Sequence, residues 1–193
     1  MRRPSSGIDD WNRLRWPQRI RRKWVMDATQ YLAQRVPGYA ELDDDERLAI
    51  GEFSLLWAAF EGAVCNTEAK PTLLLQIPVT LQEIGRLDME PYKAALEHFR
   101  NRYFANGELT HYFAGLRLDK GTRKNAELVR SVVTGDRKEP VEVLGGLLLI
   151  CHRLRNNLFH GVKMQYGIAG QRDNFRYACS ILMAVIDRHP PAY

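Results

Sequence analysis

An arginine and a histidine lie five residues apart at the end of one predicted helix, which covers about residues 140–160. Pro140 favours the first turn of this helix, and Gly161 favours its end. At about 100° per residue, the apolar side chains fall along one face: Leu147, Ile150, Cys151, Leu154 and Leu158. The opposite face carries His152, Arg155, Asn156, Phe159 and His160.

The polar face of this helix suits phosphate chemistry. Arg155 is a permanent cation whose planar donor fork fits phosphate oxygens, and His160 can exchange a proton near neutral pH. Together they could stabilise a pentavalent phosphorane and move a proton. One histidine does not easily act as acid and base at once, so we expect a symmetric dimer, and an exposed Phe159 is consistent with a covered surface. The same residues also fit a solvated helix end.

Helical periodicity extends over nearly the whole chain. We predict helices at about 17–35, 43–68, 91–105, 122–134, 140–160 and 171–188, with a short helical piece that follows the break at 106–107 and ends at Leu116. For residues 71–87 the sequence does not decide between a short helix and a loop, and it also allows a strand at 73–79. The predicted fold class is therefore all-α, a helical bundle with short connections.

Composition indicates one cytoplasmic globular domain. The 193 residues are 45% hydrophobic and 26% charged, which excludes intrinsic disorder of the whole chain. The longest apolar stretch, 141–151, is too short for a membrane span, and the N-terminus does not resemble a secretory signal. Three widely spaced cysteines argue against a disulfide framework and a zinc site. Without H-E-x-x-H, a P-loop or paired acids, we expect no metal and no cofactor.

Positive charge is concentrated at the N-terminus. Residues 1–24 hold eight Lys and Arg against two Asp, whereas the whole chain has a net charge of +5. Trp11, Trp16 and Trp24 are interleaved with these cations. The segment either contacts nucleic acid or forms an amphipathic helix with a solvated basic face. We therefore divide the chain into a basic N-terminal helix or arm, 1–42, and a helical domain, 43–193.

Two segments resemble the HEPN superfamily. The run from Arg155 to His160, followed by Gly161, resembles its motif, an arginine followed within a few residues by a histidine, commonly with a polar residue after the arginine. Residues 52–61 look like the earlier helix of stand-alone HEPN proteins from bacterial toxin–antitoxin and phage-defence loci. The resemblance covers about residues 43–188 and implies a HEPN-like bundle, with 1–42 outside it.

The resemblance implies a metal-independent endoribonuclease that forms a homodimer through the motif helix. RNA would be cut by attack of its own 2′-hydroxyl, leaving a 2′,3′-cyclic phosphate. His160 would be the general acid/base, Arg155 would bind the scissile phosphate, and Asn156 would orient His160 or the phosphate. Glu61 or Glu52 would pair with Arg155, and the sequence does not choose between these two carboxylates.

Further residues of the same region are candidates for substrate binding, namely His152, Arg153 and Lys163. The resemblance also implies a toxin or antiviral effector, with an antitoxin protein as a possible partner. The alternative is a non-catalytic HEPN-type module that binds RNA or protein through the same face. A DNA-binding regulator is a third reading, but the N-terminal segment lacks helix-turn-helix spacing.

Overall fold

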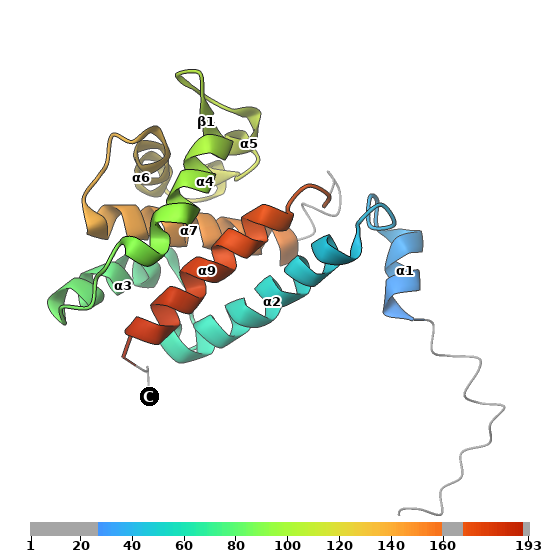
Figure 1. Ribbon diagram of the computed structural model, residues 1–193, viewed down its shortest axis with the longest axis horizontal. Helices are drawn as coiled ribbons and strands as arrows, with labels where there is room; N and C mark the ends of the chain where they lie inside the picture. The colour runs from blue at the N-terminus through green and yellow to red at the C-terminus, as the bar shows by residue number, and fades with distance from the viewer. Residues whose placement is uncertain (1–26, 160–167, 191–193) are drawn as a thin grey trace, which may run out of the picture.

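The computed structural model describes residues 27–159 and 168–190. The fold is all-α with one small hairpin (Figure 1). Its α-helices are α1 Ala28–Arg35, α2 Asp44–Cys65, α3 Pro71–Glu83, α4 Lys93–Tyr103, α5 His111–Ala114, α6 Arg123–Thr134, α7 Pro140–Phe159 and α9 Arg172–Arg188. Two 3-10 turns, η2 Glu90–Tyr92 and η3 Leu118–Lys120, and two antiparallel strands, β1 Phe104–Ala105 and β2 Glu108–Leu109, complete it. The predicted all-α fold class is therefore confirmed.

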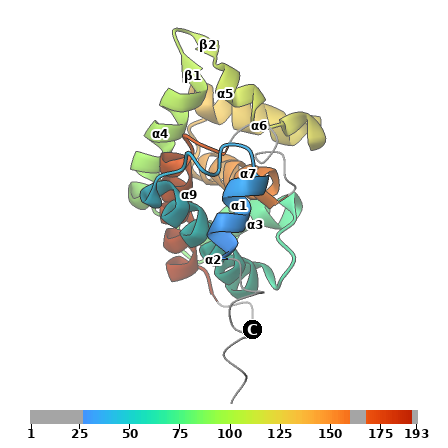
Figure 2. The ribbon, with the colours of Figure 1, turned by 90° about the vertical axis from the view of Figure 1, so that its right-hand side faces the viewer.

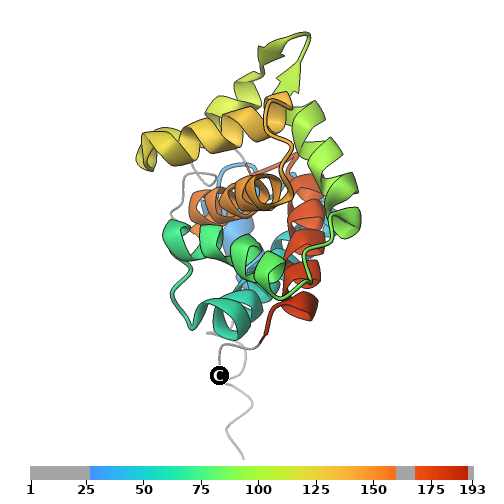
Figure 3. The ribbon, with the colours of Figure 1, turned by 90° about the vertical axis from the view of Figure 1, so that its left-hand side faces the viewer.

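Helix α7 is the centre of the bundle. It packs against α3, α6 and α9, and Figure 3 shows these three helices arranged around it. Two consecutive glycines permit the close approach. A Cβ at Gly146 would lie 2.8 Å from a methyl carbon of Val132 on α6, and one at Gly145 would lie 3.0 Å from Leu75 on α3. The small residues thus let neighbouring helices touch the α7 backbone.

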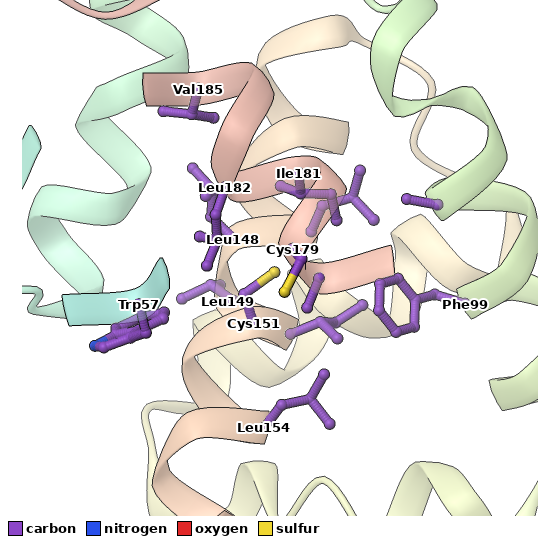
Figure 4. Close-up of a cluster of buried hydrophobic side chains, with 14 of the residues drawn as sticks. Trp57, Phe99, Leu148, Leu149, Cys151, Leu154, Cys179, Ile181, Leu182 and Val185 are labelled. Atoms are coloured by element: carbon purple, nitrogen blue, oxygen red, sulfur yellow. The ribbon is translucent and has the colours of Figure 1, made fainter. Parts of the chain in front are cut away.

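One continuous core joins α7 to α9 and α2. Figure 4 shows Leu148 and Leu149 of α7 close to Leu182 of α9, with Trp57 of α2 at one side and Leu154 of α7 farther along the same core. Each Å² of apolar surface removed from water contributes about 25 cal/mol to folding. Burial of these side chains is therefore the main contribution that stabilises the fold. All three cysteines are buried and free.

Most helix boundaries follow local signals. Asp43 caps α2, because its side chain accepts a hydrogen bond from the Glu46 backbone N–H, and three acids occupy the first turn. Thr122 caps α6 in the same way, and Gly135 ends α6 in the left-handed conformation. The predicted start near 43 and the end at 134 are confirmed.

The segment 71–87 is a helix over most of its length, so the strand considered at 73–79 is wrong. Pro71 occupies the first turn of α3, where no backbone donor is needed. Pro78 lies inside the helix, yet it is buried, and its ring approaches Gly145 of α7. Packing against α7 therefore outweighs the helix-breaking tendency of Pro78.

Helix α1 lies at the edge of the molecule. It ends at Arg35 as predicted, but it begins only after the cap Asp27, which the prediction had placed inside a helix, and none of its residues is buried. Figures 1 and 2 show it beside the beginning of α2, apart from the central helices. The part of the predicted helix before residue 27, with the basic segment 1–24 and its tryptophans, lies outside the described residues.

Helix α2 is apolar on both of its faces. Phe53, Trp57 and Phe60 are buried, whereas Leu48 and Leu55 on the outward side are 55% and 76% exposed. The helix meets the length and hydropathy criteria for a membrane span, with a mean hydropathy of 1.4 and 33% of the window buried. Core helices of soluble proteins meet the same criteria, so this finding alone assigns no membrane role.

Candidate functional site

The last turns of α7 and the middle of α2 bring five predicted or neighbouring side chains together. His152, Arg155 and Asn156 come from α7, and Trp57 and Glu61 come from α2. The three residues of α7 share one side of that helix, because positions three and four apart lie on the same helical face. We call these five residues the α2–α7 cluster. Of the five residues predicted to share a face of α7, His152, Arg155 and Asn156 lie together here, Phe159 lies beside Arg155, and His160 lies outside the described residues.

Arg155 is held by aromatic rings and an amide. Its guanidinium carbon lies 5.2 Å from the centroid of the Phe159 ring and 6.0 Å from that of Trp57. Its Nη1 donates a hydrogen bond to Asn156 Oδ1 at 3.2 Å, and its Nε is buried with no hydrogen-bond partner. Within the described parts of the chain, no carboxylate forms an ion pair with Arg155. A half-buried cation with spare donors favours an anionic ligand.

His152 is a neutral member of the α2–α7 cluster. Burial, helped by the cations of Arg153 and Arg155, lowers the pKa of His152 to about 4, against a smaller opposing effect of Glu61. The Asn156 amide nitrogen lies 3.2 Å from His152 Nε2. Because Asn156 Oδ1 already accepts from Arg155, its amide nitrogen donates to an unprotonated Nε2. A chain of hydrogen bonds therefore runs from Arg155 through Asn156 to His152.

Glu61 contributes to the cluster without binding Arg155. One of its oxygens accepts from Trp57 Nε1 at 3.2 Å, and the other accepts from the backbone N–H of Ala69 at 3.2 Å. Glu52 is exposed and lies near Cys179 of α9, whose pKa is raised mainly by burial and to a smaller extent by the charge of Glu52. Of the two carboxylates left open by the sequence, Glu61 is the one in the cluster, and neither pairs with Arg155.

Arg153 lies on another side of α7. Its Nε donates to the carbonyl oxygen of Leu116 at 2.8 Å, and burial lowers the pKa of Arg153, with smaller effects from the charges of Asp119 and Arg117. The neighbouring Asn157 likewise donates to the carbonyl of Gly115. These bonds hold the segment between α5 and η3 against α7. The structure therefore places Arg153 in a structural contact, away from the α2–α7 cluster.

Two predicted site residues, His160 and Lys163, lie outside the described residues. The last described residue of α7 is Phe159, whose side chain is 54% exposed. Trp57 was not among the predicted site residues, although it donates a hydrogen bond to Glu61 and its ring centroid lies 6.1 Å from that of His152. Its spacing of four residues before Glu61 was the available signal.

The cluster is suited to bind an anion and to orient it. No three His, Cys, Asp or Glu side chains of the described ranges gather as they would around a metal ion. Scans of family models, of curated proteins and of solved structures find no match for this chain.

Proposed function

We propose that this protein is a metal-independent endoribonuclease of the HEPN type. The observation that supports this most is Arg155, a half-buried cation paired with no carboxylate of the described residues, on the face that the sequence motif assigns to phosphate. An RNA phosphodiester supplies the missing negative charge, and the Arg155 fork matches its two non-bridging oxygens.

The cleavage step uses the 2′-hydroxyl of the RNA as the nucleophile. A base removes the 2′-hydroxyl proton as the bond from O2′ to phosphorus forms. The bond from phosphorus to O5′ then breaks, and an acid returns a proton to O5′. The products are a 2′,3′-cyclic phosphate and a free 5′-hydroxyl. Arg155 stabilises the charge on the phosphorane, and His160 is the proposed acid/base.

His152 takes a different part from His160. With a pKa of about 4, it is uncharged near neutral pH and cannot serve there as the general acid. It accepts a hydrogen bond from the Asn156 amide nitrogen, which fixes the orientation of that amide. The Asn156 carbonyl oxygen is thereby directed at Arg155, from which it accepts a hydrogen bond. We assign His152 and Asn156 as positioning residues for the guanidinium.

The proposed active form is a homodimer in which two motif helices meet. One histidine then removes a proton while the other supplies one. Phe159 at the end of α7 supports this, because a 54% exposed aromatic ring beside Arg155 is suited to a covered surface. The cellular role that goes with this activity is that of a toxin or antiviral effector restrained by an antitoxin.

The experiment compares four purified proteins on single-stranded RNA in EDTA: the parent, His160→Ala, Arg155→Met and Arg130→Met. Arg130 is an exposed arginine of α6 and serves as the matched control. We expect His160→Ala and Arg155→Met to lose activity by about a hundredfold or more and Arg130→Met to retain it. Equal cleavage by the parent and His160→Ala would contradict the proposal.

A second candidate is a non-catalytic module that binds RNA or protein through the same face. It is favoured by the exposed apolar side chains of Phe159 and Leu55, which suit a binding surface without requiring chemistry. The same assay separates the two: RNA binding that Arg155→Met weakens, with no cleavage by the parent, favours the module.

A further inference from the structure

The outward side of α2 carries a stripe of apolar and small residues. Leu48 and Leu55, which are two helical turns apart, are 55% and 76% exposed. At about 100° per residue, four small residues of α2 lie within about 60° of Leu55: Gly51, Ala58, Ala59 and Gly62. We call these six residues the α2 stripe. A Cβ at Gly51 or Gly62 would meet nothing within 4 Å, so the stripe has open space above it.

The charges beside the α2 stripe are negative. Asp44 and Glu52 lie on the same side of α2, and both are exposed. Among the 22 described residues of α2, Arg47 is the one cation, and it pairs with Asp44 and lies over the Tyr39 ring. Carboxylates repel an anionic lipid surface and an RNA strand, and a second copy of the stripe would bring like charges together. The stripe therefore favours a partner that is both apolar and basic.

The described part of the chain begins close to one end of this stripe. In Figure 1, α9 packs along one side of α2, and α1 lies near the other side, close to the residue at which α2 begins. Residues 1–26 precede α1 and lie outside the described residues. The 22 residues of α2 are about 33 Å long, and 26 residues reach about 39 Å even at the short rise of a helix. This segment is therefore long enough to follow the whole stripe.

The composition of residues 1–26 is complementary to the α2 stripe. The segment contains the large rings of Trp11, Trp16 and Trp24, whereas the stripe offers glycines and alanines that leave room for large side chains. Its eight Lys and Arg against two Asp are opposite in charge to Asp44 and Glu52. The segment thus has both properties that the stripe requires of its partner.

We propose that residues 1–26 dock on the α2 stripe of their own chain, with tryptophan rings against Leu48 and Leu55 and with cations toward the neighbouring carboxylates. Of the two interpretations that the sequence left open for this segment, the docking corresponds to the amphipathic one. Trp57 and Glu61 lie on other sides of α2, so the docking does not depend on the proposed cleavage.

The test follows the segment in the full chain by tryptophan fluorescence. In a Trp57→Phe protein, all three remaining tryptophans belong to residues 1–26, and quenching by acrylamide measures their exposure to solvent. Two substitutions are compared in this background: Leu55→Asp, on the stripe, and Met183→Asp, on α9. Met183 is an apolar helix residue that is 49% exposed, so it serves as the matched control.

Trypsin cleavage after Arg19 and Arg22, followed by mass spectrometry, is a second measurement. It uses the chain with Trp57 unchanged, so it remains informative if Trp57→Phe disturbs the core. The same two substitutions, Leu55→Asp and Met183→Asp, lie far from these cleavage sites in the sequence and leave their local sequence unaltered.

We expect acrylamide to quench the three tryptophans much less in the folded protein than in urea. Leu55→Asp should raise the quenching toward the value in urea and speed trypsin cleavage about tenfold or more, because it removes one buried leucine from the docked state, and Met183→Asp should change neither. Quenching as strong in the folded protein as in urea, or equal effects of the two substitutions, would overturn the proposal. Protection that appears only with added RNA, with anionic vesicles or at raised protein concentration would assign the segment to that other partner and overturn it as well, whether or not Arg155 supports cleavage.

Discussion

Replacing His152 with glutamine should remove a large part of the pH dependence of folding stability. In the unfolded chain a histidine titrates near its ordinary pKa of about 6.5, whereas burial lowers the folded pKa of His152 to about 4. Between these values the unfolded state binds a proton that the folded state does not bind. The free energy of unfolding therefore rises with pH from about 4 to 6.5, and the contribution is lost as pH falls through this window.

The size of this effect follows from the two pKa values. Their separation corresponds to at most about 3 kcal/mol, because each pKa unit is worth about 1.4 kcal/mol. His152 retains partial contact with solvent, so we expect about 1–3 kcal/mol. Glutamine keeps an acceptor for the Asn156 amide, and it has no charge to gain at low pH.

The assay is urea unfolding followed by circular dichroism, for the parent and His152→Gln, at several values from about pH 4.5 to 7.5. The quantity of interest is the difference in unfolding free energy between the two proteins at each pH. Titration of His98 and of the carboxylates occurs in both proteins and cancels in this difference. We expect the parent to gain about 1–3 kcal/mol relative to the variant as pH rises. A difference that is constant across this range would refute the burial of a neutral His152 in the cluster.

Three further predictions test the packing around α7. Gly146→Ala should destabilise the fold by about 1–2 kcal/mol, because the new Cβ meets the buried branched side chain of Val132 on α6. Gly51→Ala has open space around it and should stabilise the fold by up to about 1 kcal/mol. Chemical denaturation measures both changes in the free energy of unfolding. Native Cys151 and Cys179 should not react with a thiol reagent at about pH 8, because burial raises the pKa of both thiols, and rapid modification of the folded protein would contradict this. Arg153→Met should destabilise by about 1–3 kcal/mol through the loss of the half-buried hydrogen bond to the Leu116 carbonyl, yet leave any RNA cleavage per folded molecule unchanged; a selective loss of cleavage would return Arg153 to the site.

The helical period predicted the central helices and the polar face of α7 because both depend on local spacing. The leucines of α7 face the core, and His152, Arg155 and Asn156 share another side, as 100° per residue requires. Helical spacing could not predict which of the two carboxylates, Glu52 or Glu61, lies in the α2–α7 cluster. Glu52 and Glu61 are nine residues apart and so lie on opposite sides of α2, but which side meets α7 is set by tertiary packing.

Residues whose role depends on distant contacts could not be predicted in the same way. Arg153 has the charge of a phosphate ligand, but it bonds a carbonyl 37 residues earlier in the chain. Helix α3 was ambiguous because Pro78 opposes a helix locally, whereas its burial against α7 stabilises one. In each case long-range packing determines the outcome.

The central claim is that Arg155 and His160 cut RNA without a metal, by attack of the 2′-hydroxyl. The most direct measurement is analysis of the RNA ends that the purified parent produces in EDTA. We predict 2′,3′-cyclic phosphate and 5′-hydroxyl ends, with no cleavage at a nucleotide whose 2′-hydroxyl is replaced by hydrogen. Intact RNA at micromolar protein, or products that carry 5′-phosphate ends, would contradict the claim.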